Sequence, residues 1–256
     1  NIAKLELTST ELRGTRSEVI YTNVNSAELI KVTANAFLAM KVSFANSIAQ
    51  LCDSADADIN EVMNGVGSDS RIGLPFLNAG RGFGGGCLPK DVAGLISVAN
   101  SRDIDLKMMT SAVKINNYMP EYIVNKLSKG RNLKGKKVAL LGLAFKAGTS
   151  DTRKSPAVLL AKALLKRGAK VIAYDPQADT KDIPEIANKV KKCPSLKECL
   201  ESADIAIIAT DWPEFKYLSP EKYSQMMKGN ILVDGMNCLD KDAVEKAGLR
   251  YIGVGR

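Results

Sequence analysis

Histidine is absent from the 256 residues of this chain. Its absence excludes Ser–His–Asp triads and histidine-ligated zinc, and it removes the side chain that most often serves as general base. Any acid–base chemistry therefore falls to Asp, Glu, Lys, Cys or water, and we expect no metal site.

Apolar runs long enough to cross a membrane are absent too. None approaches the roughly 18–20 residues that a spanning helix needs, and the first residues lack the apolar core of a signal peptide. We therefore expect no membrane partner. Because the chain does not begin with methionine, we also expect that its numbering starts inside a longer protein.

Cysteine is sparse, and its pattern argues against a disulfide framework. The chain has five cysteines at irregular spacings, without a C-x-x-C pair: Cys52, Cys87, Cys193, Cys199 and Cys238. Such usage is typical of a reducing compartment, so we expect a cytoplasmic protein.

Acidic residues are outnumbered, and the formal net charge is +8. Such an excess favours an anionic partner such as a phosphate, a nucleotide or a nucleic acid. The lysines and arginines are dispersed, however, with no basic block of the kind that binds nucleic acid. We therefore interpret them as a solvated surface with one local phosphate site, and expect no nucleic-acid partner.

We expect the first half of the chain to be mainly helical. Residues 1–24 show no clear periodicity and are interpreted as a linker from a domain outside the chain. Asn25 is the expected cap of a long helix over residues 27–51, whose apolar positions cover much of its circumference. We expect this helix to be buried on more than one side and to pair with its twin in a homodimer. Further helices are expected over residues 58–65, 89–100 and 106–129, and no strand is expected here.

The second half changes character. Short apolar runs typical of buried parallel strands alternate with helical segments, including a helix over residues 155–167. This alternation predicts an α/β parallel sheet covered on both faces. We expect an all-helical central domain over residues 25–129 and a Rossmann-like nucleotide-binding domain over residues 130–256. The expected strands cover residues 137–142, 170–175, 203–209, 230–234 and 250–254.

The most informative stretch is GFGGGCLPKD, residues 82–91. Cys87 follows a run of glycines and precedes an expected helix start, with Pro89 suited to the first helical position. Backbone N–H groups and the positive end of the helix dipole there favour thiolate over thiol. The alternative is a buried structural cysteine beside a glycine loop.

A dinucleotide fingerprint can be read in the same stretch. Gly80, Gly82 and Gly85 match G-x-G-x-x-G, but that motif requires a preceding strand. The preceding residues 71–78 contain a proline and read as a loop. We therefore reject this match as a cofactor site.

Lys31 and Asn35 are four residues apart and share one face of the long helix. They lie either on a solvent-facing stripe or in a cleft, and spacing alone does not decide between these alternatives. In a cleft with Cys87 and Asp91, they suggest an oxidation. The thiolate attacks an aldehyde, the thiohemiacetal loses hydride, and water hydrolyses the thioester. Asp91 would help activate that water, and Lys31 would stabilise the oxyanion.

Four stretches resemble the UDP-glucose/GDP-mannose dehydrogenase family: KVTANAFLA (31–39), SRIG (70–73), GFGGGCLPKD (82–91) and GLAFKAGTSDTR (142–153). The resemblance implies an NAD-dependent, four-electron oxidation of the C6 alcohol of a nucleotide sugar to a carboxylate. The catalytic residues that it implies are Cys87, Lys31, Asn35 and Asp91. The GFGGGCLPKD stretch looks more like the UDP-glucose branch of the family. GDP-mannose oxidation and a non-catalytic nucleotide-sugar-binding module are the alternatives. Enzymes for N-acetylated sugars usually carry histidine where Gly86 stands.

The resemblance also implies substrate contacts. Arg71 would bind substrate across the interface of a homodimer. The other implied substrate-binding residues are Phe76, Leu77, Phe83, Gly84, Phe145 and Lys146. The implied NAD contacts within the chain are Lys90 and Arg153.

Two departures from the family pattern stand out. Met236 occupies the place of an arginine that the family often has in an Asp-Gly-Arg-Asn stretch. An N-terminal NAD-binding domain is not found in this sequence, so we expect a substrate-binding portion that is inactive alone.

Overall fold

The computed structural model describes residues 2–6 and 19–256, so most of the expected linker lies outside the described residues. Its remainder forms two antiparallel strands, β1 (Ile2–Glu6) and β2 (Val19–Asn23), with Ile2 opposite Asn23. The prediction of a first half without strands was therefore wrong. The β2 sequence VIYTN is rich in β-branched residues but too short to show a period.

The long helix α1 (Val24–Ala55) extends beyond its predicted bounds at both ends. Its cap is Asn23, whose Oδ1 accepts from Ser26 N at 2.8 Å, so Asn25 is not the cap as predicted. Helix α2 (Ile59–Gly67) follows, with Asp58 as its cap.

The buried positions of α1 are mostly small residues, whereas several of its large apolar side chains are exposed. The buried positions include Ala36, Ala39, Ala45 and Ala49. The large side chains of Phe37, Phe44 and Leu51 are about half exposed, at 54%, 48% and 60%. Small side chains let other helices approach α1 closely. Helical periodicity reveals a stripe but cannot tell which stripe is covered.

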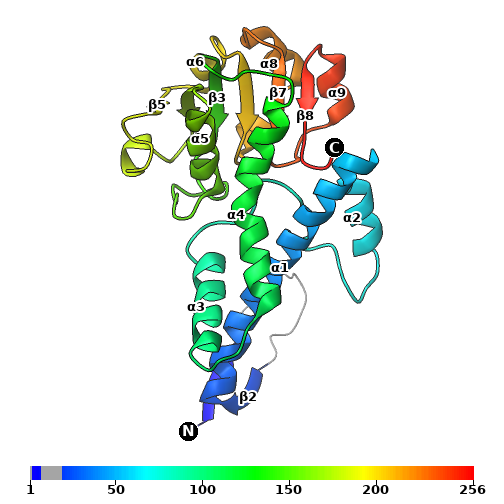
Figure 1. Cartoon of the computed structure of the whole chain (residues 1–256), viewed down its shortest axis with the longest axis vertical. Coiled ribbons are helices and arrows are strands. Elements are labelled where there is room, and N and C mark those ends of the chain that lie inside the picture. Colours follow the sequence, from blue (N-terminus) through cyan, green and yellow to red (C-terminus); the bar gives the residue numbers. More distant parts are fainter. Residues whose placement is uncertain (1, 7–18) are drawn as a thin grey trace.

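Two helices pack against α1: α3 (Leu88–Asn100) and α4 (Lys107–Ser128). In Figure 1, α4 runs along the molecule beside α1 and reaches the sheet. The last turns of α4 bury Ile123, Val124 and Leu127 in the same apolar core as the first strand of the sheet. Helix α4 therefore joins the helical half to the sheet half.

The sheet half contains six parallel strands in the order β5-β4-β3-β6-β7-β8. Its strands are β3 (Lys137–Leu141), β4 (Lys170–Tyr174), β5 (Lys191–Lys192), β6 (Ile205–Ile208), β7 (Ile231–Asp234) and β8 (Arg250–Ile252). The five predicted strands are present, and β5 escaped prediction because it has only two residues. The order reverses between β3 and β6, the topological switch point at which such sheets bind ligands.

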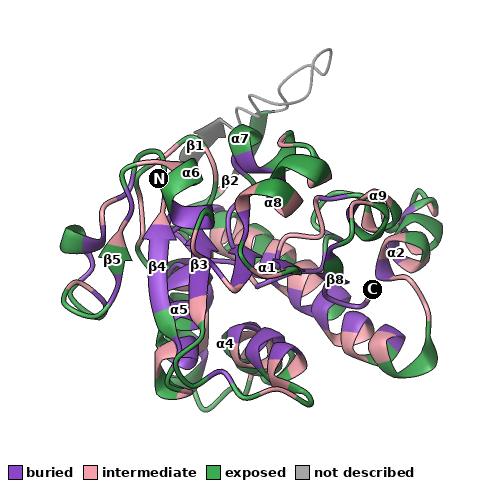
Figure 2. Ribbon diagram, turned by 90° about the horizontal axis from the view of Figure 1, so that it is seen from above, coloured by how far each residue is buried: buried purple, intermediate pink, exposed green. Residues whose placement is uncertain are grey.

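Helices cover the sheet, and most of β3 and β4 is buried (Figure 2). The covering helices are α5 (Pro156–Lys166), α6 (Leu196–Leu200), α7 (Pro213–Lys216), α8 (Pro220–Met226) and α9 (Lys241–Lys246), with the 3-10 turn η1 (Thr180–Asp182). The architecture is the predicted one: a helical domain followed by an α/β domain with a parallel sheet.

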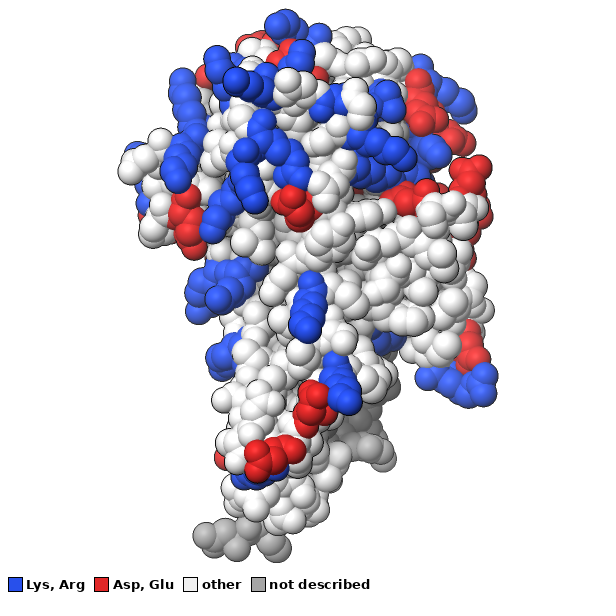
Figure 3. Space-filling view, in the orientation of Figure 1, with Lys and Arg blue, Asp and Glu red and all other residues white. Residues whose placement is uncertain are grey.

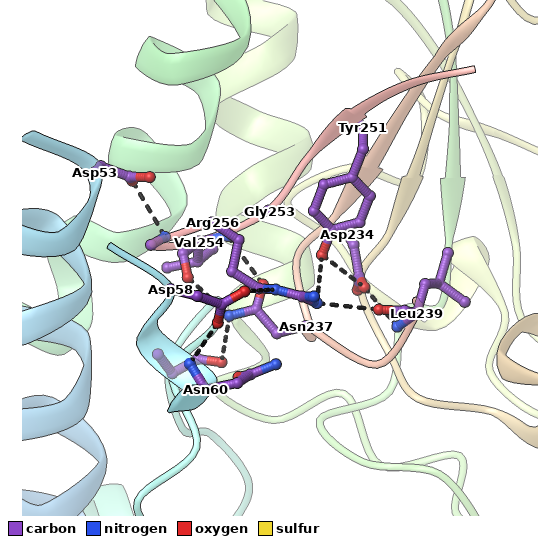
Figure 4. A network of polar contacts seen from close by, with 12 residues as sticks. Asp53, Asp58, Asn60, Asp234, Asn237, Leu239, Tyr251, Gly253, Val254 and Arg256 are labelled. Atoms are coloured by element: carbon purple, nitrogen blue, oxygen red, sulfur yellow. Dashed lines mark hydrogen bonds and ion pairs between the residues drawn. The ribbon is translucent and has the colours of Figure 1, made fainter. Parts of the chain in front are cut away.

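The C-terminal segment fastens the sheet half to α1 and α2 (Figure 4). Arg256 Nε pairs with Asp58 at 2.9 Å, and Gly255 N donates to Asp53 at 3.2 Å. Asn237 exchanges two hydrogen bonds with Val254, at 2.7 and 2.9 Å. The loop after β7 is thereby held close to α2.

Charge is distributed unevenly between the halves. Residues 1–129 carry 13 basic and 13 acidic side chains, whereas residues 130–256 carry 23 and 15. The net charge therefore lies in the sheet half, where Figure 3 shows Lys and Arg gathered over the upper part of the molecule. None of the described helices combines the length and the hydropathy needed to cross a membrane.

Candidate functional site

A carboxylate of α3 meets an ammonium and an amide of α1. Lys31 Nζ donates to Asp91 Oδ2, and Asn35 Nδ2 donates to the same oxygen at 2.5 Å. Lys31 and Asn35 thus both face Asp91, as in the cleft alternative, although Lys31 remains 51% exposed. Asp91 itself is 5% exposed.

This arrangement keeps Asp91 ionised. The hydrogen bond from Lys31 is the main reason that the pKa of Asp91 lies below its usual value. Burial acts in the opposite direction, and the hydrogen bond from Asn35 adds to the lowering. A small apolar cluster that includes Ala36, Ala39 and Val92 holds α3 on α1 and so brings these groups together.

Cys87 lies immediately before α3, at its N-terminal cap. Its carbonyl accepts from Asp91 N at 2.9 Å, which places the carboxylate one helical turn from the cysteine. The Cys87 side chain is exposed, so the alternative of a buried structural cysteine is wrong. Pro89 occupies the second position of α3, not the first as predicted.

The glycines before Cys87 allow close contact with the segment that follows β3. A Cβ on Gly84 would lie 2.5 Å from Lys154 O, and one on Gly85 would lie 2.7 Å from the Phe145 ring. Gly85 also has φ +84°, and its N–H donates to Arg153 O at 2.9 Å. The loop is therefore fastened to the sheet half. The nearest neighbours of these glycines are other parts of the chain.

Residues 68–87 form turns and irregular backbone without a strand. The rejection of G-x-G-x-x-G as a dinucleotide motif is thereby confirmed, since the motif requires a strand before it.

Asn116 of α4 fixes the loop from its other side, a role that sequence reasoning missed. Its Oδ1 accepts from Phe83 N at 2.7 Å, and its Nδ2 donates to Phe83 O at 3.0 Å. Gly82, at φ +99°, passes so close that a Cβ would lie 2.5 Å from Asn116 Oδ1. The sequence feature that could have identified Asn116 is a polar residue among the apolar positions of a helix. In the structure, Asn116 is 7% exposed.

A polar cavity of about 530 Å³ separates α2 from the loop that carries Phe76 and Leu77. Leu77 is 3% exposed and lines this cavity, whereas Phe76 adopts φ +66° and is 40% exposed. The other lining residues are Asn60, Met63, Asn64, Leu74, Pro75, Asn78 and Asn237. Asn237 follows β7, so both halves of the chain form the cavity.

A second cavity, of about 370 Å³, lies beside the start of α3. Phe83, Pro89 and Asn116 line it from the helical half, and Arg153 lines it from the sheet half. Arg153 is 75% exposed and pairs with Asp151 at 2.7 Å. The hydrogen bond to Asp151 raises the pKa of Arg153.

The remaining predicted residues are exposed cations. Lys90 is 77% exposed, and its Nζ lies 4.0 Å from Asp91 Oδ1. Lys146 Nζ lies 5.7 Å from the centroid of the Phe145 ring. Arg71 is 86% exposed and pairs with Asp69, so it does not join the Asp91 cluster.

Arg81 is the second residue that sequence reasoning missed. Its guanidinium is buried at the carboxyl end of β3, where Nη2 donates to Ala144 O at 3.2 Å and to Phe145 O at 2.8 Å. The sequence feature that could have identified Arg81 is an arginine inside a glycine-rich loop.

Comparison with known proteins decides the family. Residues 25–118 match the central domain of the UDP-glucose/GDP-mannose dehydrogenase family, and residues 139–241 match its UDP binding domain. The chain belongs to this family. The matched segments contain the α1–α3 cluster and the switch point of the sheet.

Several dehydrogenases of this family are similar along most of the chain. UDP-glucose 6-dehydrogenase of Rickettsia bellii is 41% identical over 243 residues, which cover 93% of this chain and 56% of that protein. A UDP-glucose dehydrogenase structure from Pyrobaculum islandicum has a TM-score of 0.79 at 36% identity, covering 90% of this chain and 51% of that one. A UDP-D-ManNAc dehydrogenase from Pyrococcus horikoshii has a TM-score of 0.78 at 31% identity, covering 92% and 53%. This chain therefore spans about half the length of the relatives that it matches.

Proposed function

We propose that this chain is the substrate-binding and cysteine-bearing portion of a UDP-glucose 6-dehydrogenase. The observation that carries the proposal is the buried Asp91, held by Lys31 and Asn35, one turn from the exposed Cys87. A carboxylate, an ammonium and an accessible thiol at a helix N-terminus are what thioester chemistry requires. The similarity to UDP-glucose 6-dehydrogenases supports UDP-glucose as the substrate.

In this mechanism, Cys87 Sγ bonds to the C6 aldehyde that the first oxidation produces. Lys31 stabilises the resulting oxyanion, and oxidation of the thiohemiacetal leaves a thioester on Cys87. Water then attacks the thioester carbonyl and gives up its proton to Asp91. The carbon–sulfur bond breaks, which releases the carboxylate and returns Cys87 as thiolate. An oxyanion donor of this kind typically lowers the barrier by about 2.7–4 kcal/mol.

Both oxidations require a hydride acceptor, which NAD supplies when bound. The glycine-rich loop does not fit a dinucleotide, because no strand precedes it and its glycines contact Phe145 and Lys154. Lys90, in the first turn of α3, and Arg153, close to Gly86 just before that helix, are exposed cations that would suit a pyrophosphate. We infer that these two residues contact the cofactor and that its main site lies outside this chain.

The substrate's nucleotide would bind between the two halves. Leu77 lines the larger cavity on the helical side, next to Phe76 in the chain, and Phe145 and Lys146 follow β3 at the switch point of the sheet. Phe83 and Gly84 would fix the floor of the sugar site beside Cys87. The positive charge of the sheet half supports binding of a diphosphate there.

We also propose a homodimer formed through α1. Phe37, Phe44 and Leu51 are spaced by seven residues, so they lie on one face of the helix, about half exposed. A second copy of α1 would cover this face. In that assembly, the exposed Arg71 would reach the substrate of the second copy.

Thermal unfolding with ligands tests the proposal. A ligand at 100 times its Kd stabilises the folded state by about 2.7 kcal/mol. For a chain of this size, that corresponds to a rise in Tm of roughly 5–10 °C. We expect this rise with UDP-glucose and a smaller one with GDP-mannose, and no rise with NAD alone. Stabilisation by NAD without stabilisation by UDP-glucose would contradict the assignment.

A further inference from the structure

Arg81 places a buried positive charge at the topological switch point, although it belongs to the loop of the helical half. The residue is 1% exposed. The carbonyls that accept from its Nη2 belong to Ala144 and Phe145, in the segment that follows β3. Nucleotides bind at this edge in sheets of this kind.

The guanidinium is incompletely paired. Its Nη1 is buried without a hydrogen-bond partner among the described residues, and its Nε faces Met236 Sδ at 3.2 Å. No described carboxylate forms an ion pair with it. The nearby Asp175 is occupied, since it accepts from the backbone N–H groups of Leu143 and Ala144 and from the Trp212 side chain.

An unpaired buried cation is costly, so proteins normally supply an anion. Burial lowers the pKa of Arg81 to about 10, and the charges of Asp211 and Asp175 only partly oppose this shift. A bound anion would satisfy Nη1 and offset the cost of burial.

The position of Arg81 is fixed by its backbone. Arg81 N donates to Gly235 O at 2.8 Å, and Gly80 N donates to Asn46 Oδ1 at 2.8 Å. A Cβ on Gly80 would lie 2.7 Å from Gly235 O, so the two segments are in close contact. These backbone contacts therefore fix the position of the guanidinium at the end of β7.

We propose that Arg81 binds the diphosphate of the nucleotide sugar at the switch point, after the side chain of Met236 moves aside. The inference rests on the proposed function. Met236 is partly exposed and has a flexible side chain, which can uncover Nε and Nη1. The planar fork of arginine suits a diphosphate, and Lys146, which follows Phe145 in the chain, provides a second cation.

Met236 gives the proposal a second argument. Met236 is one of the two departures from the family pattern, because it stands where the family often has an arginine. The structure instead places the guanidinium of Arg81 against the Met236 sulfur. The positive charge beside position 236 is thus supplied by Arg81 of the glycine-rich loop. Exchanging Arg and Met between positions 81 and 236 tests this substitution of one segment for the other.

Titration calorimetry with UDP and with uridine tests this role, because only UDP carries the phosphates. We expect R81M to weaken UDP binding by about 10–100-fold, as for loss of a charged hydrogen bond, and to leave uridine binding unchanged. The double variant R81M/M236R should recover most of the UDP affinity. The matched control is R102M, which removes an exposed arginine at the end of α3 and should bind both ligands like the parent.

The possible outcomes separate this inference from the proposed function. If the parent chain binds neither UDP nor UDP-glucose, the proposed function fails and this inference with it. If the parent binds UDP and R81M binds it equally well, or loses uridine affinity in parallel, only the role of Arg81 is overturned. Should R81M not fold, R81K replaces it. It keeps the charge without the fork, so UDP affinity should fall several-fold at constant uridine affinity, and unchanged UDP affinity would overturn the proposal.

Discussion

Cys87 differs from the other cysteines in its surroundings. Cys52, Cys193 and Cys199 are buried, and Cys238 is partly exposed. Burial and the neighbouring Asp234 raise the pKa of Cys238, which suppresses its reactivity. Cys87 alone combines exposure with a helix N-terminus.

We therefore expect one fast-reacting thiol when the native chain is treated with iodoacetamide near neutral pH. Peptide mass analysis should place the label on Cys87, and the variant Cys87→Ser should lose it. UDP-glucose should slow the labelling. Equal labelling of Cys87 and the buried Cys199 before unfolding would contradict this expectation.

Asp91 should make stability depend on pH in the acid range. Its pKa is lowered in the folded state, so it contributes stability that is present above its ordinary value of 3.8 and is lost as pH falls through the folded value. Urea unfolding between pH 3 and 7 should show the parent more stable than Asp91→Asn at pH 6, with a gap that shrinks below pH 4.

Glu245→Gln is the control for this measurement, because Glu245 is exposed on α9. This substitution should leave the acid limb of the stability curve unchanged. A constant gap between parent and Asp91→Asn across the range would mean that the contacts of Asp91 do not depend on its charge.

At the scale of elements, the glycine-rich loop is held between two neighbours. Asn116 of α4 binds its Phe83 backbone, and the segment after β3 covers its glycines. The loop leads directly into α3, so both contacts determine where the cysteine lies.

Replacing Asn116 tests the contact with α4. Asn116→Ala leaves the Phe83 N–H and C=O without their partner, which should destabilise the chain by about 1–3 kcal/mol. Asn117→Ala, at the exposed neighbouring position, should stay within about 0.5 kcal/mol of the parent. Urea denaturation measures both. Equal effects of the two substitutions would show that the loop does not depend on Asn116.

At the scale of the whole molecule, the two halves are joined by a shared core and by the C-terminal segment (Figure 4). The ion pair of Arg256 with Asp58 and the contacts of Lys126 with Asp53 and Gly253 link α2, α1 and α4 to the end of the chain. The cavity that borders Leu77 depends on this joint, because Asn237 forms part of both.

The exposed face of α1 predicts an assembly. Phe44→Glu places a charge in the centre of that face and should convert the proposed dimer into a monomer at micromolar concentration, measured by light scattering. Tyr217→Glu, at a position 76% exposed in the sheet half, should leave the mass unchanged. A monomeric parent chain would refute the homodimer.

Much of the fold could be predicted because its signals are local. Apolar runs such as residues 137–141 and glycine or proline at helix ends identify the five longer strands of the parallel sheet and the main helices within a few residues. The strands β1 and β2 could not be recognised, since short strands are decided by pairing with a partner that spacing does not reveal.

The candidate site was partly predictable for a similar reason. Motif residues such as Lys31, Asn35 and Asp91 could be named from the sequence, but their hydrogen bonds depend on how α3 lies on α1. Arg81 and Asn116 were not found, because a buried polar side chain gains its meaning only from partners distant in sequence, such as Ala144 and Phe83.

The sequence by itself determined the helical and α/β halves, the glycine-rich loop that carries Cys87 and the family, since each depends on residue type and short-range spacing. Only the tertiary structure decided that the small-residue face of α1 is covered, that Asp91 is ion-paired and that the guanidinium of Arg81 lies at the switch point. These features depend on long-range packing and on the removal of water from charged groups, and neither is encoded within a few neighbouring residues.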